Sequence, residues 1–190
     1  MLAEIIATAR KRLAENPFDA LHGVEHHQNV WNNCEWIIEK EGLSPDLDVL
    51  QIAVWWHDVE RDSEEFPQMK RTLRDAGASD EFIGKVLAAV STHSFGHTQD
   101  ILEGKILYDA DKLEYLSINR VKELLRIRKQ GQMGEARFEY YQKTWAKRLK
   151  QVPKSLHFES SKTRFQEDLR KFLEFAQTQP TLESMISSML

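Results

Sequence analysis

The chain has 190 residues, 41% of them hydrophobic and 29% charged, so it can bury one core without disulfides or structural metals. Its 26 basic and 30 acidic residues give a formal net charge of -4 and are spread through the sequence, which excludes the basic footprint of a nucleic-acid binder. We therefore expect no long nucleic acid as a partner. A small anionic substrate is still compatible with this charge, because a bound cation can set the local field.

The compartment is indicated by three features of the sequence. Cys34 is the single cysteine and cannot form an internal disulfide, which fits a reducing environment. Residues 1–17 interrupt their apolar positions with charges and lack the continuous apolar core of a signal peptide. No stretch approaches the roughly 18 apolar residues of a membrane span. We expect a cytoplasmic protein that does not engage a membrane, and the oligomeric state is left open.

Apolar residues recur at spacings of three and four almost throughout the chain, which predicts an all-α fold. Ser44 is expected to cap the third helix, with Pro45 at its first position, and this apolar helix should be central and buried. Gly42 and Ser79 mark a helix end and a helix start. The expected helices cover residues 2–14, 22–40, 45–58, 67–77, 80–92, 101–129, 135–149 and 160–177.

The domain organisation is predicted to be simple. No internal repeat, low-complexity tract or linker divides the sequence. We expect a single helical domain over residues 1–190, with the chemically distinctive motifs at about 20–117 and further helices at about 119–177.

Imidazole and carboxylate groups concentrate in four segments, which are HGVEHH at 22–27, HD at 57–58, HSFGH at 93–97 and DAD at 109–111. Such groups bind Mn, Fe, Co, Ni or Zn, whereas Mg usually prefers oxygen alone. The four segments together indicate a metal site.

Helix geometry narrows the candidates for metal ligands. His22 and His26 are four residues apart and share a helix face that should point inward, whereas His27 points elsewhere. Neighbouring residues at a helix end can converge on one ion, and His57-Asp58 closes the apolar helix. Asp109 and Asp111 lie on different sides of a helix, so only one of them should bind.

In this order the segments resemble the HD superfamily of metal-dependent phosphohydrolases, whose pattern is a histidine on one helix, then His-Asp, then a later aspartate. The flanks HGVEHHQNV, AVWWHDV and ILYDADKL are similar to the family's segments, and the resemblance covers residues 20–117. It implies an HD-type helical bundle and a divalent cation, whether Mn, Fe, Co, Ni, Zn or Mg. The ligands that it implies are His26, His57, Asp58 and Asp111.

The resemblance also separates the two aspartates of the last segment. Asp111 directly precedes Lys112-Leu113, as the family aspartate precedes a basic residue and a leucine, so Asp111 is the implied ligand. Asp109 is then expected beside the site or on the surface.

The activity that the resemblance implies is hydrolysis of a small phosphate compound, such as a nucleotide or a related phosphoester or phosphoanhydride. Candidate proton-transfer groups are Glu60 and Asp62. The branch of the family that hydrolyses guanosine polyphosphates carries Glu-Asp at positions 61 and 62, where Asp62 matches and Arg61 departs. Lys112, Arg61 and His93 are candidates for offsetting charge on the phosphoryl oxygens.

Two other functions stay open at this point. A non-catalytic HD module would keep the metal for structure and bind a nucleotide or a protein partner. An HD oxygenase would use two irons, for which His93 and His97 could supply additional ligands. Measurements of metal content and of phosphate release distinguish both of these functions from phosphohydrolysis.

Overall fold

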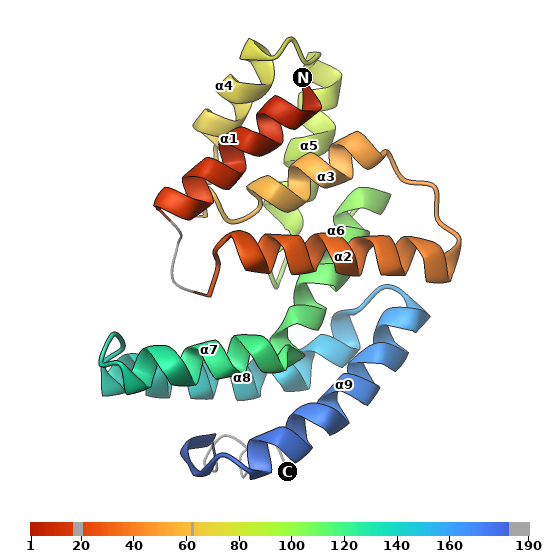
Figure 1. Ribbon diagram of the computed structural model, residues 1–190. Coiled ribbons are helices and arrows are strands. Elements are labelled where there is room, and N and C mark those ends of the chain that lie inside the picture. The colour runs from red at the N-terminus through yellow and green to blue at the C-terminus, as the bar shows by residue number, and fades with distance from the viewer. Residues whose placement is uncertain (17–20, 62, 183–190) are drawn as a thin grey trace. The chain divides into compact units, whose positions relative to one another are not determined.

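A computed structural model describes residues 1–16, 21–61 and 63–182, and every regular element among these residues is helical (Figure 1). The expectation of an all-α fold is confirmed. None of the described helices combines the length and the apolar character needed to cross a membrane. The chain divides into two compact units, Met1–Asp111 and Lys112–Leu190, and the expected single domain over residues 1–190 stays a prediction.

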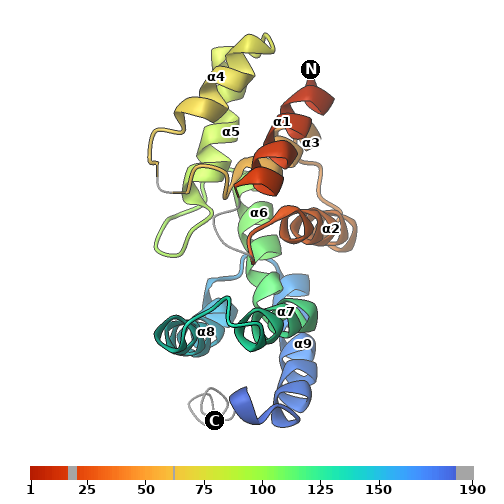
Figure 2. The same cartoon turned by 60° about the vertical axis from the view of Figure 1, so that its left-hand side comes forward.

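The first unit is organised around α3 (Leu47–Trp56), which packs against α1, α2 and α5 (Figures 1 and 2). Seven of its ten residues are buried, and all seven are apolar, as expected for a central helix. The other helices of this unit are α1 (Leu2–Glu15), α2 (Val24–Glu41), α4 (Pro67–Asp75), which packs on α1 and α5, α5 (Asp80–Thr92) and α6 (Leu102–Leu113).

Helix boundaries in this unit follow local capping chemistry. The carboxylate of Asp46 accepts a hydrogen bond from the backbone N–H of Val49 at 3.2 Å, so α3 begins at Leu47. The prediction that Ser44 caps this helix is therefore wrong. The Ser79 cap of α5 is confirmed by its bond from the Phe82 N–H, and Gly42 ends α2 in the left-handed conformation with φ 63°.

The second unit begins within α6, and the single helix expected over residues 101–129 is interrupted after Leu113. A 3-10 turn, η1 (Glu114–Leu116), follows α6, and Ser117 then caps α7 (Ile118–Lys129). The remaining elements are α8 (Glu135–Ser155), α9 (Glu159–Gln177) and η2 (Pro180–Leu182). Helix α8 runs six residues beyond its expected end and contains Pro153.

Aromatic contacts form the core of the second unit. The indole of Trp145 stacks on Phe172 of α9, and its Nε1–H donates a hydrogen bond to the Tyr115 carbonyl at 2.6 Å. The Arg128 guanidinium lies over the ring of Phe138, 3.9 Å from its centroid. These contacts join η1, α7, α8 and α9.

Candidate metal centre

His57 and Asp58 lie in the turn that directly follows α3. His57 is completely buried, and its Nδ1 lies 2.7 Å from the carbonyl oxygen of Val54. Because a carbonyl can only accept a hydrogen bond, Nδ1 carries the proton. The other ring nitrogen, Nε2, therefore has a lone pair in the neutral form, which is the tautomer that a metal ligand needs.

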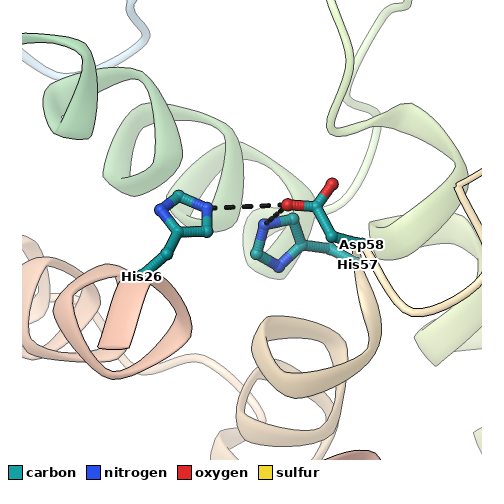
Figure 3. Close-up of side chains that lie close together, drawn as sticks. All are labelled: His26, His57 and Asp58. Carbon is teal, nitrogen blue, oxygen red and sulfur yellow. Dashed lines mark ion pairs between the residues drawn. The ribbon is translucent and has the colours of Figure 1, made fainter. Parts of the chain in front are cut away.

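The imidazole of His26 approaches the same place from α2 (Figure 3). Its Nε2 lies 3.6 Å from Oδ2 of Asp58, and Nε2 of His57 lies 3.2 Å from the same oxygen. One ligand atom from each of these three buried residues falls within 4.8 Å of the others, so the group can hold a metal ion.

Asp111 joins this cluster from α6. Its Oδ1 lies 3.4 Å from Nε2 of His26 and 4.0 Å from Nε2 of His57. The four residues implied by the family resemblance are thus brought together from three separate stretches of the first unit. We call His26, His57, Asp58 and Asp111 the His-Asp cluster.

The chemistry of the His-Asp cluster fits a cation. In the neutral form of His57 a lone pair faces the Asp58 carboxylate across 3.2 Å, and two carboxylates lie close to the same imidazole. Buried in this way, the nitrogen lone pair and the carboxylate oxygens repel one another unless a proton or a metal ion lies between them. Imidazole nitrogen combined with carboxylate oxygen is the donor set of first-row transition metals.

The Asp58 carboxylate is held in its charged form. Burial alone would raise its pKa, but the positive charges that His57, His22 and His26 carry in their protonated forms bring the pKa well below its usual range. Asp58 is therefore ionised at neutral pH, as a metal ligand must be.

The second oxygen of Asp58 faces a different pair of cationic or hydrogen-bonding groups. Oδ1 lies 3.4 Å from Nη1 of Arg61 and 3.8 Å from Nε2 of His93. His93 follows α5 and is buried, and its Nδ1 donates to the Val90 carbonyl at 2.6 Å, so its Nε2 is directed to the cluster side. The side chain of Arg61 is 35% exposed, so it can also meet a solute.

The carboxylate of Glu60 lies against the first turn of α4. Its two oxygens accept hydrogen bonds from the backbone N–H groups of Gln68 at 3.0 Å and Met69 at 2.7 Å. These are orphan donors of the first helical turn, so Glu60 caps α4 from eight residues away. Its expected part in proton transfer stays a prediction.

Two further expected residues are not placed against the cluster. Asp62 lies outside the described residues. Lys112 is buried and follows Asp111 in α6, but it opens the second compact unit. The catalytic roles expected for both stay predictions.

The histidines of the first and third segments differ from the simple helical expectation. Helix α2 begins at Val24, so His22 precedes it and the shared helix face with His26 does not form. Helix α5 ends at Thr92, and His97 is exposed in the loop that follows Gly96. His93 alone of the HSFGH pair therefore has contacts with the cluster in the described part of the chain.

His27 is a neighbour that the sequence pattern missed. It is completely buried, its ring centroid lies 4.5 Å from that of His57, and it stacks on Trp55. Its Nδ1 donates to the Gly23 carbonyl at 2.9 Å. Burial, and then the charges of His57 and His26, lower the pKa of His27 well below its usual range, so its ring is neutral. The inference that His27 points elsewhere than the inward face of His26 is wrong, because its ring lies beside His57.

Asn33 is a second missed residue. It lies seven positions after His26 on α2, is buried, and donates from Nδ2 to the carbonyl oxygen of Ala110 at 3.0 Å. Ala110 immediately precedes Asp111, so this bond connects the helix of one expected ligand to the backbone beside another. A single asparagine in a helical segment carries no motif that identifies such a partner 77 residues away.

No family model matches the chain, and no curated protein does. Similar folds are found among solved structures. One is a structural-genomics target from Lactobacillus plantarum, with a TM-score of 0.71 and 20% identity over 93% of each chain. Another, from an uncultured Thermotogales bacterium, is described as a predicted HD superfamily hydrolase. Its TM-score is 0.61, with 22% identity over 93% of this chain and 89% of that chain. The chain thus has the fold of a predicted HD superfamily hydrolase, which confirms the HD-type helical architecture expected from its motifs.

Proposed function

We propose that this protein is a metal-dependent phosphohydrolase of the HD superfamily that acts on a small phosphate compound. The observation that carries the proposal is the convergence of His26, His57, Asp58 and Asp111 on one buried place, with distances of 3.2 to 4.0 Å between their nitrogen and oxygen atoms. A structural neighbour described as a predicted HD superfamily hydrolase supports the same reaction class.

The two carboxylate oxygens of Asp58 would have different roles, and Oδ2 would be the one that binds the metal. Oδ2 of Asp58, with Nε2 of His26 and His57, would hold a divalent ion, and Asp111 would complete the ligand set. When bound, such an ion supplies Lewis-acid polarisation of a phosphoryl oxygen and activation of water. The mixed nitrogen and oxygen donors favour Mn, Fe, Co, Ni or Zn over Mg.

Arg61 and His93 would orient the phosphate. Both lie beside Oδ1 of Asp58, on the carboxylate oxygen that is not shared with His26 and His57. The guanidinium N–H groups, and the Nε2–H of His93 when its ring is doubly protonated, can bind phosphoryl oxygens next to a cation and stabilise the charge that grows on them in the transition state. A nucleotide or a related phosphoester or phosphoanhydride would provide such oxygens.

A phosphate-release screen tests this proposal. The purified chain is loaded in turn with Mn, Fe, Co, Ni, Zn and Mg, and is offered nucleotides, pyrophosphate, phosphomonoesters and phosphodiesters, with Asp58→Ala as the matched control. We expect release with at least one substrate and metal, and its loss in Asp58→Ala. Metal binding without release from any compound would favour a non-catalytic module, and two irons per chain with oxygen consumption would favour an oxygenase.

A further inference from the structure

Charge is distributed very unevenly between the two compact units. The first unit, Met1–Asp111, contains 10 basic and 21 acidic residues, whereas the second, Lys112–Leu190, contains 16 basic and 9 acidic residues. The formal net charges are therefore -11 and +7. The nearly balanced total of the whole chain conceals a second unit with the composition of a polyanion-binding module.

The excess of basic residues gathers on α8. Residues 140–158 contain five lysines and arginines and no acidic residue. Four acidic residues of the second unit lie in ion pairs away from this segment, namely Glu123–Arg126, Glu135–Arg128, Glu159–Lys162 and Asp168–Lys171. Glu139, one turn before the segment, pairs with Lys143 at 3.6 Å. Residues 140–158 therefore carry a formal charge of +5, and the single acidic residue that precedes them on the same face offsets one of these charges.

Four lysines of α8 form one continuous stripe. Lys143, Lys147, Lys150 and Lys154 are all exposed, and their spacing of four, three and four residues places them on one helix face. The buried residues Phe138, Trp145, Leu149 and Val152 occupy the opposite face. With a rise of 1.5 Å per residue, the stripe is about 16 Å long.

Tyr140 extends the stripe by one turn toward the start of α8. Its side chain is 57% exposed, which is unusual for a large aromatic group, and the Arg137 guanidinium lies 5.5 Å from its ring centroid. An exposed ring beside a row of lysines can stack on an unpaired base while the lysines follow the phosphates. A membrane surface would instead need several apolar side chains on this face.

We propose that this lysine stripe, Lys143, Lys147, Lys150 and Lys154 with Tyr140, binds single-stranded nucleic acid through its phosphate backbone. The proposal does not depend on the activity of the His-Asp cluster. It revises the expectation, drawn from the whole-chain charge, that a long nucleic acid is not a partner.

Fluorescence anisotropy tests this proposal. The full chain is titrated into a labelled single-stranded RNA, and separately into a single-stranded DNA of the same sequence, over a range of salt concentrations. We expect the logarithm of the affinity to fall with the logarithm of salt concentration with a slope of about -3 if all four lysines contact phosphates. The variant Lys147→Gln/Lys154→Gln should reduce this slope by about 1.4 and weaken binding on the order of tenfold at moderate salt.

The matched control is Lys162→Gln/Lys171→Gln on α9, which removes the same charge from the same unit but from lysines that are ion-paired. It should bind nearly as well as the wild type. Lys147→Arg/Lys154→Arg should retain binding, and Tyr140→Ala should weaken it about tenfold. Circular dichroism of each variant verifies folding.

Absence of binding by the wild type at low salt would overturn the proposal. Equal losses in the α8 and α9 variants would also overturn it, because binding would then follow total charge and not the stripe. Retention of the chain by phosphatidylserine vesicles, without binding to either strand, would assign the stripe to a membrane surface instead.

Discussion

The side-chain amide of Asn33 donates a hydrogen bond to the carbonyl oxygen of Ala110 at 3.0 Å, which ties α2 to the last turn of α6. Carbonyl groups in the last turn of a helix need partners from outside that helix. His26 lies two turns before Asn33, and Asp111 follows Ala110 directly. The bond therefore fixes the distance between two members of the His-Asp cluster.

Replacing Asn33 with alanine should weaken metal binding without touching any ligand. The buried carbonyl of Ala110 would lose its partner, at a cost of about 1–3 kcal/mol in the free energy of unfolding, and Asp111 would be less well positioned. Metal titration by calorimetry and thermal unfolding measure the two effects. Asn32→Ala, an exposed neighbour on the same helix, should change neither quantity. An unchanged metal affinity in Asn33→Ala would show that Asn33 does not position the cluster.

Glu60→Ala should destabilise the start of α4. The substitution removes both acceptors of the Gln68 and Met69 N–H groups, and charge-assisted hydrogen bonds of this kind are worth about 1.5–3 kcal/mol each. Glu60→Gln keeps one acceptor oxygen and should lose less stability. Denaturant unfolding gives the free energies, and hydrogen exchange at Gln68 and Met69 localises the change. If Glu60→Ala lost phosphate release while stability and exchange were unchanged, the proton-transfer role predicted from sequence would be favoured over capping.

The sequence predicted the helices well wherever a cap or an apolar stripe was strong, as at Ser79, Gly42 and the central helix α3. It failed at Asp46, where two cap residues competed, and at Glu114–Leu116, where a 3-10 turn interrupts an unbroken helical pattern. Helical periodicity shows where a helix can form. It does not show which of two cap residues begins the helix, or where a 3-10 turn interrupts it.

The cluster was anticipated through the order of its motifs, since each single histidine or aspartate is uninformative. The contacts of His27, Asn33 and Glu60 could not be anticipated in the same way. Each depends on a backbone carbonyl or N–H group, or on a ring, that only the folded chain brings near. The helical periodicity of α2 predicted the wrong orientation for His27. A helix surrounded by neighbours can bury polar residues on more than one face.

Arg61→Ala should weaken phosphate binding more than metal binding. Its guanidinium lies 3.4 Å from Oδ1 of Asp58 and is partly open to solvent, so it can donate to a phosphoryl oxygen. Loss of one charge-assisted hydrogen bond corresponds to about tenfold in affinity for inorganic phosphate or in KM. Arg61→Lys should recover part of this loss, and Arg71→Ala, an exposed arginine of α4, is the control. Equal phosphate affinity in Arg61→Ala and the wild type would contradict this role.

Cys34 should be inert in the folded protein. Burial, followed by the charges of Glu35, Asp111 and Asp109, raises the pKa of its thiol well above the usual range, so the reactive thiolate does not form near neutral pH. Modification by a disulfide reagent should be slower in the native state than in denaturant by on the order of a hundredfold or more. Rapid labelling of the native protein between pH 7 and 8 would contradict the buried placement of α2 against its neighbours.

Elemental analysis tests most directly whether the His-Asp cluster holds a divalent ion. The protein is loaded with Mn, Ni or Zn, and unbound metal is removed before the measurement. Asp58→Asn keeps the shape of the side chain and removes the charge that the cluster needs. We expect stoichiometric metal in the wild type and little in Asp58→Asn, together with loss of phosphate release. Absence of stoichiometric metal from the wild type, or equal metal content in the two proteins, would contradict the account.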